Sequence, residues 1–213
     1  MSAAPPIAVS CGEPAGIGPE VAAKAWAATR LPLIWIGDPR HLPPGTPWEG
    51  CAPEEAATLA PRALPVLRRD FGPPAVAGRP DPAHAAPVVA AIEEGVALVR
   101  AGRAAALCTA PISKAALARG AGFAHPGHTE FLAHLAGGAE VAMMIASPAL
   151  RVVPATIHVP LSEVPRLLTP ALLGSVLRIT HAALRDDFGL PAPRLAVAGL
   201  NPHAGEDGRM GRE

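Results

Sequence analysis

The chain has 213 residues, of which 50% are hydrophobic and 17% are charged, so it can bury a substantial core. Eighteen basic residues balance eighteen acidic ones, and aromatic residues make up only 3%, without any tyrosine. Binding to nucleic acid usually needs a surplus of positive charge, and binding to single strands uses aromatic rings for stacking. The composition therefore argues against a nucleic-acid partner, although it allows a local basic pocket for a small phosphorylated ligand.

The sequence also indicates where the protein works. Residues 1–10 lack the positive flank of a secretory signal, and no uncharged apolar run approaches the roughly 18 residues of a membrane span. The three cysteines, Cys11, Cys51 and Cys108, are widely spaced and odd in number, which favours a reducing compartment without disulfides. We expect a cytoplasmic protein with no membrane partner.

Short apolar runs alternate with longer amphipathic stretches in the first half of the chain. Strands are expected at 7–10 and 33–36, with a helix over about 19–28 between them. The segment 41–81 is rich in proline, and its pattern predicts only a connection with short pieces. Apolar residues recur at helical spacing over 88–100, which predicts a helix there.

The second half continues the alternation and completes the predicted fold class. Thr169 is a good N-cap and Pro170 suits the first position of a helix. Alternating strands and helices predict an α/β fold, with a mostly parallel sheet sandwiched by helices. The remaining expected elements are a strand over 104–109, short helices over 112–118 and 129–135, strands over 141–146 and 151–156 around a tight turn, and a strand over 194–200.

Ligands of open α/β sheets bind beyond the carboxyl ends of the strands, so the loops that follow the expected strands are the candidate sites. Glycines stand at 12, 16 and 18, ahead of a helix whose N-terminus could face an anion. The spacing matches neither G-x-G-x-x-G nor a phosphate-binding P-loop. A tight turn that begins the helix explains the glycines equally well.

Two later loops carry polar residues at the start of a helix. Lys114 could reach an anionic ligand, although a solvated surface lysine is the interpretation that the sequence favours. His128 and Thr129 lie at a junction of loop and helix, where they could donate hydrogen bonds to a phosphate or carboxylate. The alternative is that Thr129 serves only as an N-cap.

His158 and His203 each follow an expected strand, with one helix between them. In a parallel β-α-β unit the chain returns to the same edge of the sheet, so the two imidazoles could converge. Neutral imidazole is a common ligand of divalent metals, and a catalytic metal usually has three protein ligands. Glu206 and Asp207 could orient such a ligand. Ordinary loop histidines are the alternative.

Five sequence strings occur in the order found in the 4-hydroxythreonine-4-phosphate dehydrogenase family. The chain resembles this family over residues 7–213, and the first and last strings are the most specific. The strings are GEPAGIGPE at 12–20, TAPISK at 109–114, GHTEF at 127–131, TIHVPL at 156–161 and GLNPHAGE at 199–206.

The resemblance implies an isocitrate/isopropylmalate dehydrogenase-like fold and a homodimer with the active site at the subunit interface. It implies oxidation of 4-phosphooxy-L-threonine by NAD or NADP to a 3-oxo acid. That acid decarboxylates to 3-amino-2-oxopropyl phosphate, in the biosynthesis of pyridoxine 5'-phosphate. A divalent metal (zinc, magnesium or cobalt) is expected, held by three histidines.

The resemblance also assigns residues. By motif, His128 and Thr129 correspond to residues that contact the substrate, and His158 and His203 correspond to two of the three metal ligands. It assigns no catalytic residue and no dinucleotide-binding residue in this chain.

Members of the family continue beyond the last residue of this sequence. Residues 1–213 are therefore expected to be an N-terminal portion of the dehydrogenase, with a fold that is incomplete at its C-terminus and an internal boundary left unassigned. The third histidine and residues for the substrate phosphate are expected in the continuation, so we expect little activity from the chain alone. The alternatives are a paralogue that oxidises a four-carbon sugar-acid phosphate or a cis-diol acid, and an inactive fragment that only binds ligands.

Overall fold

The computed structural model describes residues 4–211 and divides the chain into two compact units. Unit 1 ends at Gly137 and unit 2 begins at Gly138. Both glycines have positive φ, 83° and 75°, a conformation that costs glycine much less than other residues. Each unit is described by itself.

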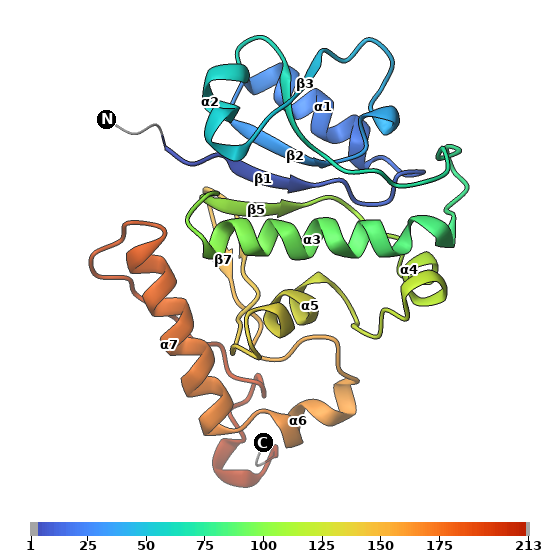
Figure 1. Cartoon of the computed structure of the whole chain (residues 1–213). Coiled ribbons are helices and arrows are strands. Elements are labelled where there is room, and N and C mark those ends of the chain that lie inside the picture. Colours follow the sequence, from blue (N-terminus) through green and yellow to red (C-terminus); the bar gives the residue numbers. More distant parts are fainter. Residues whose placement is uncertain (1–3, 212–213) are drawn as a thin grey trace. The chain divides into compact units, whose positions relative to one another are not determined.

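Unit 1 is built on a parallel sheet with the strand order β3-β4-β2-β1-β5 (Figure 1). The strands expected at 7–10 and 33–36 are confirmed, and the one expected at 104–109 forms from residue 106. All five residues of β2 are buried, as expected for a central strand covered on both faces. The strands are β1 Ile7–Ser10, β2 Leu33–Gly37, β3 Trp48–Gly50, β4 Leu64–Arg68 and β5 Ala106–Thr109.

Helices cover this sheet, and α3 packs along β1 and β5. The connection from β1 through α1 to β2 runs across the sheet in the opposite direction to that from β4 through α3 to β5. Because such connections are right-handed, α1 and α3 are expected on opposite faces, in keeping with their separate places in Figure 1. The helices are α1 Gly18–Thr29, α2 Ala56–Leu59, α3 Ala85–Arg100, α4 Lys114–Ala121 and α5 His128–Leu135.

The helix predicted over 88–100 forms as α3 and approaches the sheet closely. A Cβ atom on Gly95 would lie 2.6 Å from Cδ1 of Leu107 in β5, so a larger residue at this position would require the Leu107 side chain to move. The helical stretch Pro82–Arg100 is long and apolar enough to cross a membrane by length and composition. Val88 and Ile92 are fully buried in unit 1. The helix is therefore apolar because it packs against the core of this unit.

The prediction for 41–81 was incomplete, because two strands form within this proline-rich segment. β4 lies between β2 and β3 although it contains Pro65, and proline is found chiefly on edge strands because it lacks an N–H donor. β3 has only three residues, and all are exposed. Neither strand therefore carries the usual sequence pattern of a strand.

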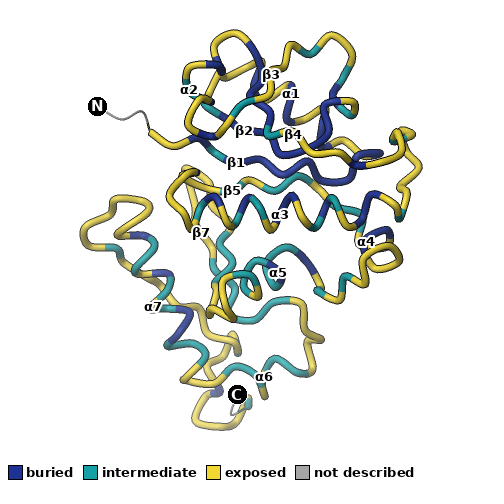
Figure 2. Tube along the Cα trace, viewed as in Figure 1, coloured by how far each residue is buried: buried dark blue, intermediate teal, exposed yellow. Residues whose placement is uncertain are grey.

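Unit 2 is centred on helix α7 Pro170–Asp186. The predicted start of this helix is confirmed, because the Thr169 hydroxyl accepts a hydrogen bond from the backbone N–H of Leu172 at 3.1 Å. The other elements are the strands β6 Ile145–Ala146 and β7 Arg151–Val152 and the short helix α6 Val164–Leu167. Figure 2 shows mostly exposed and half-buried residues here, in contrast to the buried strands of unit 1.

Two predictions for unit 2 need correction. The strands expected over 141–146 and 151–156 shrink to a two-residue antiparallel hairpin, β6 and β7. The strand expected over 194–200 is wrong, since this segment has no regular structure. A strand needs a neighbour for its backbone hydrogen bonds, and within the described residues of unit 2 no strand pairs with this segment.

Candidate functional site

The loops that follow β1 and β5 interlock at the carboxyl edge of the sheet. The backbone N–H of Glu13 donates to the carbonyl oxygen of Pro111 at 2.8 Å. Gly12 has a φ of 68°, and a Cβ there would lie 2.5 Å from that same oxygen. A Cβ on Gly18 would lie 2.4 Å from the carbonyl oxygen of Cys11. Close backbone packing thus accounts for both glycines.

Helix α4 is held firmly at this edge. The Ser113 hydroxyl accepts a hydrogen bond from the backbone N–H of Ala116 at 3.3 Å, so Ser113 is its N-cap and Lys114 its first residue. The helix predicted over 112–118 therefore begins two residues later. A Cβ on Gly120 would lie 2.0 Å from the carbonyl oxygen of Pro82, so α4 meets the turn before α3 at this glycine.

Aromatic packing anchors helix α5 and the loop before it. The Phe123 and Phe131 rings lie 5.0 Å apart in an edge-to-face arrangement, and Phe131 is 4% exposed. His125 lies 5.0 Å from Phe131 and 5.1 Å from His134, ring centre to ring centre. His125 also makes an edge-to-face contact with Phe123 at 5.3 Å, and such pairs favour a fixed geometry, so His125 packs within this aromatic cluster and His134 borders it.

His128 is the first residue of α5, and Thr129 follows it. The imidazole is half-buried, and its Nε2 is buried without a hydrogen-bond partner among the described residues. Burial and the nearby Lys114 ammonium lower the pKa of His128, which favours the neutral imidazole. The alternative that Thr129 serves only as an N-cap is wrong, because Gly127 occupies the N-cap position and no side chain caps this helix.

Lys114 reaches the start of α5 from the start of α4. A Cβ on Gly127 would lie 3.9 Å from the Lys114 Nζ and 3.4 Å from the Glu130 Oε2. The ammonium and the carboxylate therefore approach the same point beside His128. The sequence favoured a solvated surface lysine, and Lys114 is indeed exposed, but nothing in the sequence placed its charge beside His128.

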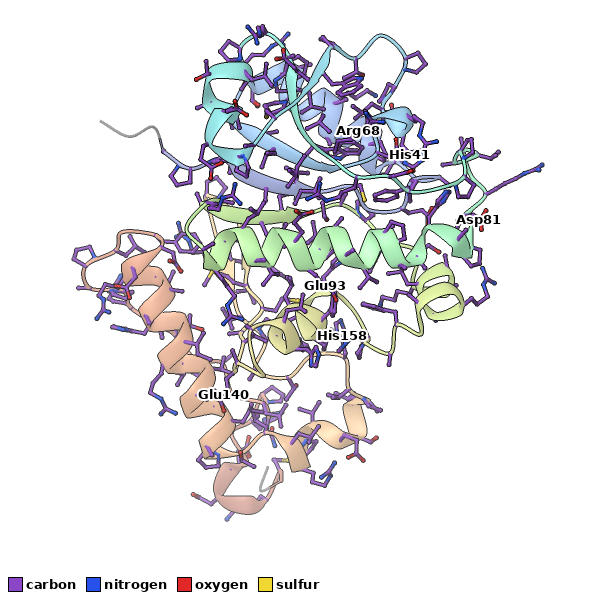
Figure 3. All side chains as sticks on the ribbon, viewed as in Figure 1. His41, Arg68, Asp81, Glu93, Glu140 and His158 are labelled. Atoms are coloured by element: carbon purple, nitrogen blue, oxygen red, sulfur yellow. The ribbon has the colours of Figure 1, made fainter. Side chains whose placement is uncertain are left out.

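The two expected metal ligands lie in unit 2. His158 is exposed and follows β7 in a bend, with a φ of 56° (Figure 3). His203 is held by its own loop, where its Nδ1 lies 2.9 Å from the Glu206 Oε1 and its backbone N–H donates to the Asn201 Oδ1 at 2.9 Å. Glu206 thus contacts the histidine that it was expected to orient.

The β-α-β geometry expected to bring these histidines together does not form. β7 pairs with β6 in an antiparallel hairpin, and the segment before His203 is not a strand. Within residues 4–211, no three His, Cys, Asp or Glu side chains form a group that could hold a metal. The spacing argument for convergence therefore fails, whereas the assignment of His158 and His203 by motif stays a prediction.

Backbone strain is concentrated in the two loops that contain His158 and His203. Five described residues other than glycine have positive φ, and Arg30 is the only one outside these loops. Such residues cost of order 1–3 kcal/mol each and concentrate at functional sites. The other four are His158, Ala204, Glu206 and Asp207.

A second polar cluster fixes the loops after β2 and β4. Buried Asp38 accepts backbone N–H bonds from Arg40 at 3.0 Å and from Phe71 at 3.1 Å, and it pairs with the Arg40 guanidinium. Arg40 also contacts Asp70 at 2.8 Å. Burial alone would raise the pKa of Asp38, but these hydrogen bonds hold it well below its usual range.

His41 lies beside this cluster, between two other rings (Figure 3). Its centroid is 5.6 Å from that of Phe71 and 5.6 Å from that of His84. Burial lowers the pKa of His41, so its neutral form is favoured there. A groove of about 630 Å³ borders His41 and α1, and its cations Lys24 and Arg40 are paired with Glu20 and Asp38.

Unit 1 therefore combines a parallel sheet with polar side chains at helix starts beyond the carboxyl edge. This is the arrangement of the α/β enzymes that bind small ligands at that edge. The comparisons with known proteins specify the family. The family model described as pyridoxal phosphate biosynthetic protein PdxA matches residues 27–213. The chain belongs to this family.

Individual relatives agree with this assignment. A 4-hydroxythreonine-4-phosphate dehydrogenase from Ruegeria sp. (strain TM1040) is 59% identical, over 100% of this chain and 67% of the relative. The crystal structure of the enzyme of that name from Klebsiella pneumoniae is 32% identical, with a TM-score of 0.86 over 98% of this chain and 67% of that one. The chain thus spans about two thirds of the length of these relatives.

A relative with another name shares the fold. The crystal structure of a terephthalate 1,2-cis-dihydrodiol dehydrogenase from Burkholderia xenovorans LB400 is 27% identical, with a TM-score of 0.68 over 99% of this chain and 66% of that one. Dehydrogenases of more than one substrate class are therefore similar to this chain.

Proposed function

We propose that the protein takes part in the oxidation of 4-phosphooxy-L-threonine by NAD or NADP, in pyridoxine 5'-phosphate biosynthesis. The observation that carries the proposal is the 59% identity, over the whole chain, to a relative named 4-hydroxythreonine-4-phosphate dehydrogenase. A homodimer and a cytoplasmic location belong to the same proposal.

His128 and Thr129 are the proposed substrate-binding residues. A neutral imidazole and a hydroxyl group, beside helix N–H groups that no side chain caps, offer several donors to an anionic oxygen. The half-buried position of His128 strengthens these bonds because water competes less there. The site thus suits the phosphate or the carboxylate of a small substrate.

His158 and His203 are the proposed ligands of a divalent metal (zinc, magnesium or cobalt). The contact of Glu206 with Nδ1 of His203 supports this, since metal-binding histidines usually bond a carboxylate through their other nitrogen. A metal in such an enzyme polarises the reacting oxygen. Residues 4–211 do not supply three ligands in one group, so we assign no reaction step to a metal.

The alternative substrates provide the test. Binding of 4-phosphooxy-L-threonine, a four-carbon sugar-acid phosphate and a cis-diol acid to the purified protein would be measured by calorimetry, with and without NAD or NADP. Formation of NADH or NADPH would be followed in the same mixtures. The proposal predicts preferred binding of 4-phosphooxy-L-threonine. Preferred binding of the cis-diol acid would instead support the function named for the Burkholderia xenovorans relative.

A further inference from the structure

Lys114 is unusual in this chain by its residue type. Of the eighteen basic residues sixteen are arginine, and the two lysines are Lys24 and Lys114. Lys24 forms an ion pair with Glu20 at 2.5 Å, one turn away on the exposed side of α1. A surface helix in this protein therefore usually carries its positive charge on arginine, so the lysine that starts α4 calls for an explanation.

The backbone that carries Lys114 is fixed on both sides. The Ser113 cap holds the first turn of α4, and Leu117 is 1% exposed in the core of unit 1. The close approach at Gly120 fixes the far end of the helix. A side chain on such an element is better placed to hold a ligand than one on a free loop.

The ammonium is directed to the expected substrate residues. Its Nζ would lie 3.9 Å from a Cβ on Gly127, the residue directly before His128 and Thr129. Its charge also acts on the His128 imidazole. The carboxylate of Glu130 approaches the same point and balances part of this charge.

We propose that Lys114 is a further substrate-binding residue, whose ammonium binds an anionic oxygen of the substrate beside His128 and Thr129. This inference rests on the proposed function. A neutral imidazole and a hydroxyl can donate hydrogen bonds, but neither carries the charge that pairs with a phosphate or a carboxylate. Lys114 supplies that charge from a fixed helix start.

Chemical labelling uses the fact that the chain has only two lysines. Reductive ¹³C-methylation of the purified protein gives two lysine side-chain signals in the NMR spectrum, which the Lys24→Arg variant assigns. Addition of 4-phosphooxy-L-threonine is expected to shift the Lys114 signal and to raise its pKa, while the Lys24 signal stays in place. Equal shifts of both signals, or none at Lys114 under saturating substrate, would overturn the inference.

Affinity measurements separate the two possible anions. Lys114→Gln is expected to weaken binding of 4-phosphooxy-L-threonine by about tenfold or more, because a hydrogen bond to a charged group is lost. Lys114→Arg should restore part of the affinity, and Lys24→Gln should match the parent. If Lys114→Gln leaves the affinity for 4-hydroxy-L-threonine, which lacks the phosphate, unchanged, then Lys114 binds the phosphate. If the affinities for both ligands fall by the same factor, Lys114 binds the carboxylate.

The failures are distinguishable. Suppose that the parent binds 4-phosphooxy-L-threonine, that His128→Ala loses this binding and that Lys114→Gln keeps it. In that case only the inference about Lys114 is wrong. If the parent binds no 4-phosphooxy-L-threonine, the proposed function falls and the inference falls with it. Because Lys114 is exposed, Lys114→Gln is expected to unfold at the same temperature as the parent, which circular dichroism would verify.

Discussion

At the scale of single residues, the proposed substrate site makes a direct prediction. His128→Ala and Thr129→Val should each weaken binding of 4-phosphooxy-L-threonine by about tenfold or more, since a charged ligand loses one hydrogen bond in each case. Calorimetric titration measures both. His181→Ala is a matched control because His181 is exposed on α7 in unit 2. Unchanged affinity in His128→Ala would contradict the assignment.

Asp38 makes a prediction about stability and pH. Asp38→Asn should lower the free energy of unfolding of unit 1 by about 1–3 kcal/mol at pH 7, because it removes a buried carboxylate charge that accepts several hydrogen bonds and pairs with the exposed Arg40 guanidinium. The folded-state pKa of Asp38 is lowered, so this stability is present above about pH 4 and is lost as the pH falls below it.

Tryptophan fluorescence measures this effect in unit 1 alone, because Trp26, Trp35 and Trp48 all lie there. Urea unfolding of the parent and of Asp38→Asn should differ clearly at pH 7, and the difference should shrink progressively as the pH falls from about 4 through the lowered pKa of Asp38. A difference that stays constant over this pH range would contradict the role of the Asp38 charge.

At the scale of elements, two helical glycines make opposite predictions. Gly120→Ala should destabilise the packing of α4 by about 1–3 kcal/mol, since the new methyl group would meet the Pro82 carbonyl oxygen. Gly174→Ala in α7 would meet only the Arg178 guanidinium at 3.3 Å, which can move. That change should stabilise its helix by about 0.5–1 kcal/mol, because alanine favours helices over glycine.

Hydrogen exchange of the α4 and α7 backbone amides distinguishes the two glycines. Exchange should become faster in α4 of Gly120→Ala and slower in α7 of Gly174→Ala. Slower exchange in α4 would mean that helix propensity outweighs the close contact at Gly120.

Elements with local signals could be predicted from the sequence. The apolar runs of β1 and β2, the periodicity of α3 and the cap at Thr169 each act within a few residues. β4 could not be predicted because Pro65 contradicts a central strand, and only pairing on both sides stabilises it. The strand expected over 194–200 failed for the converse reason, since an apolar pattern does not supply a partner strand.

At the scale of the whole molecule, the order of the motifs in the sequence predicted the family, which the comparisons confirm, whereas the site residues assigned by those motifs stay predictions. The approach of Lys114 to the start of α5 could not be predicted, because it depends on how α4 and α5 pack within unit 1. The expected meeting of His158 and His203 rested on a parallel strand that does not form, so only the motif supports that pair.

The start of α5 is the proposed recognition site for 4-phosphooxy-L-threonine in this member of the PdxA family. The most direct test of this site is calorimetric titration of the purified protein with that compound and with a cis-diol acid. We expect saturable binding of 4-phosphooxy-L-threonine that His128→Ala weakens by about tenfold or more, with weaker binding of the cis-diol acid. Absence of binding to the parent, or a clear preference for the cis-diol acid, would contradict it.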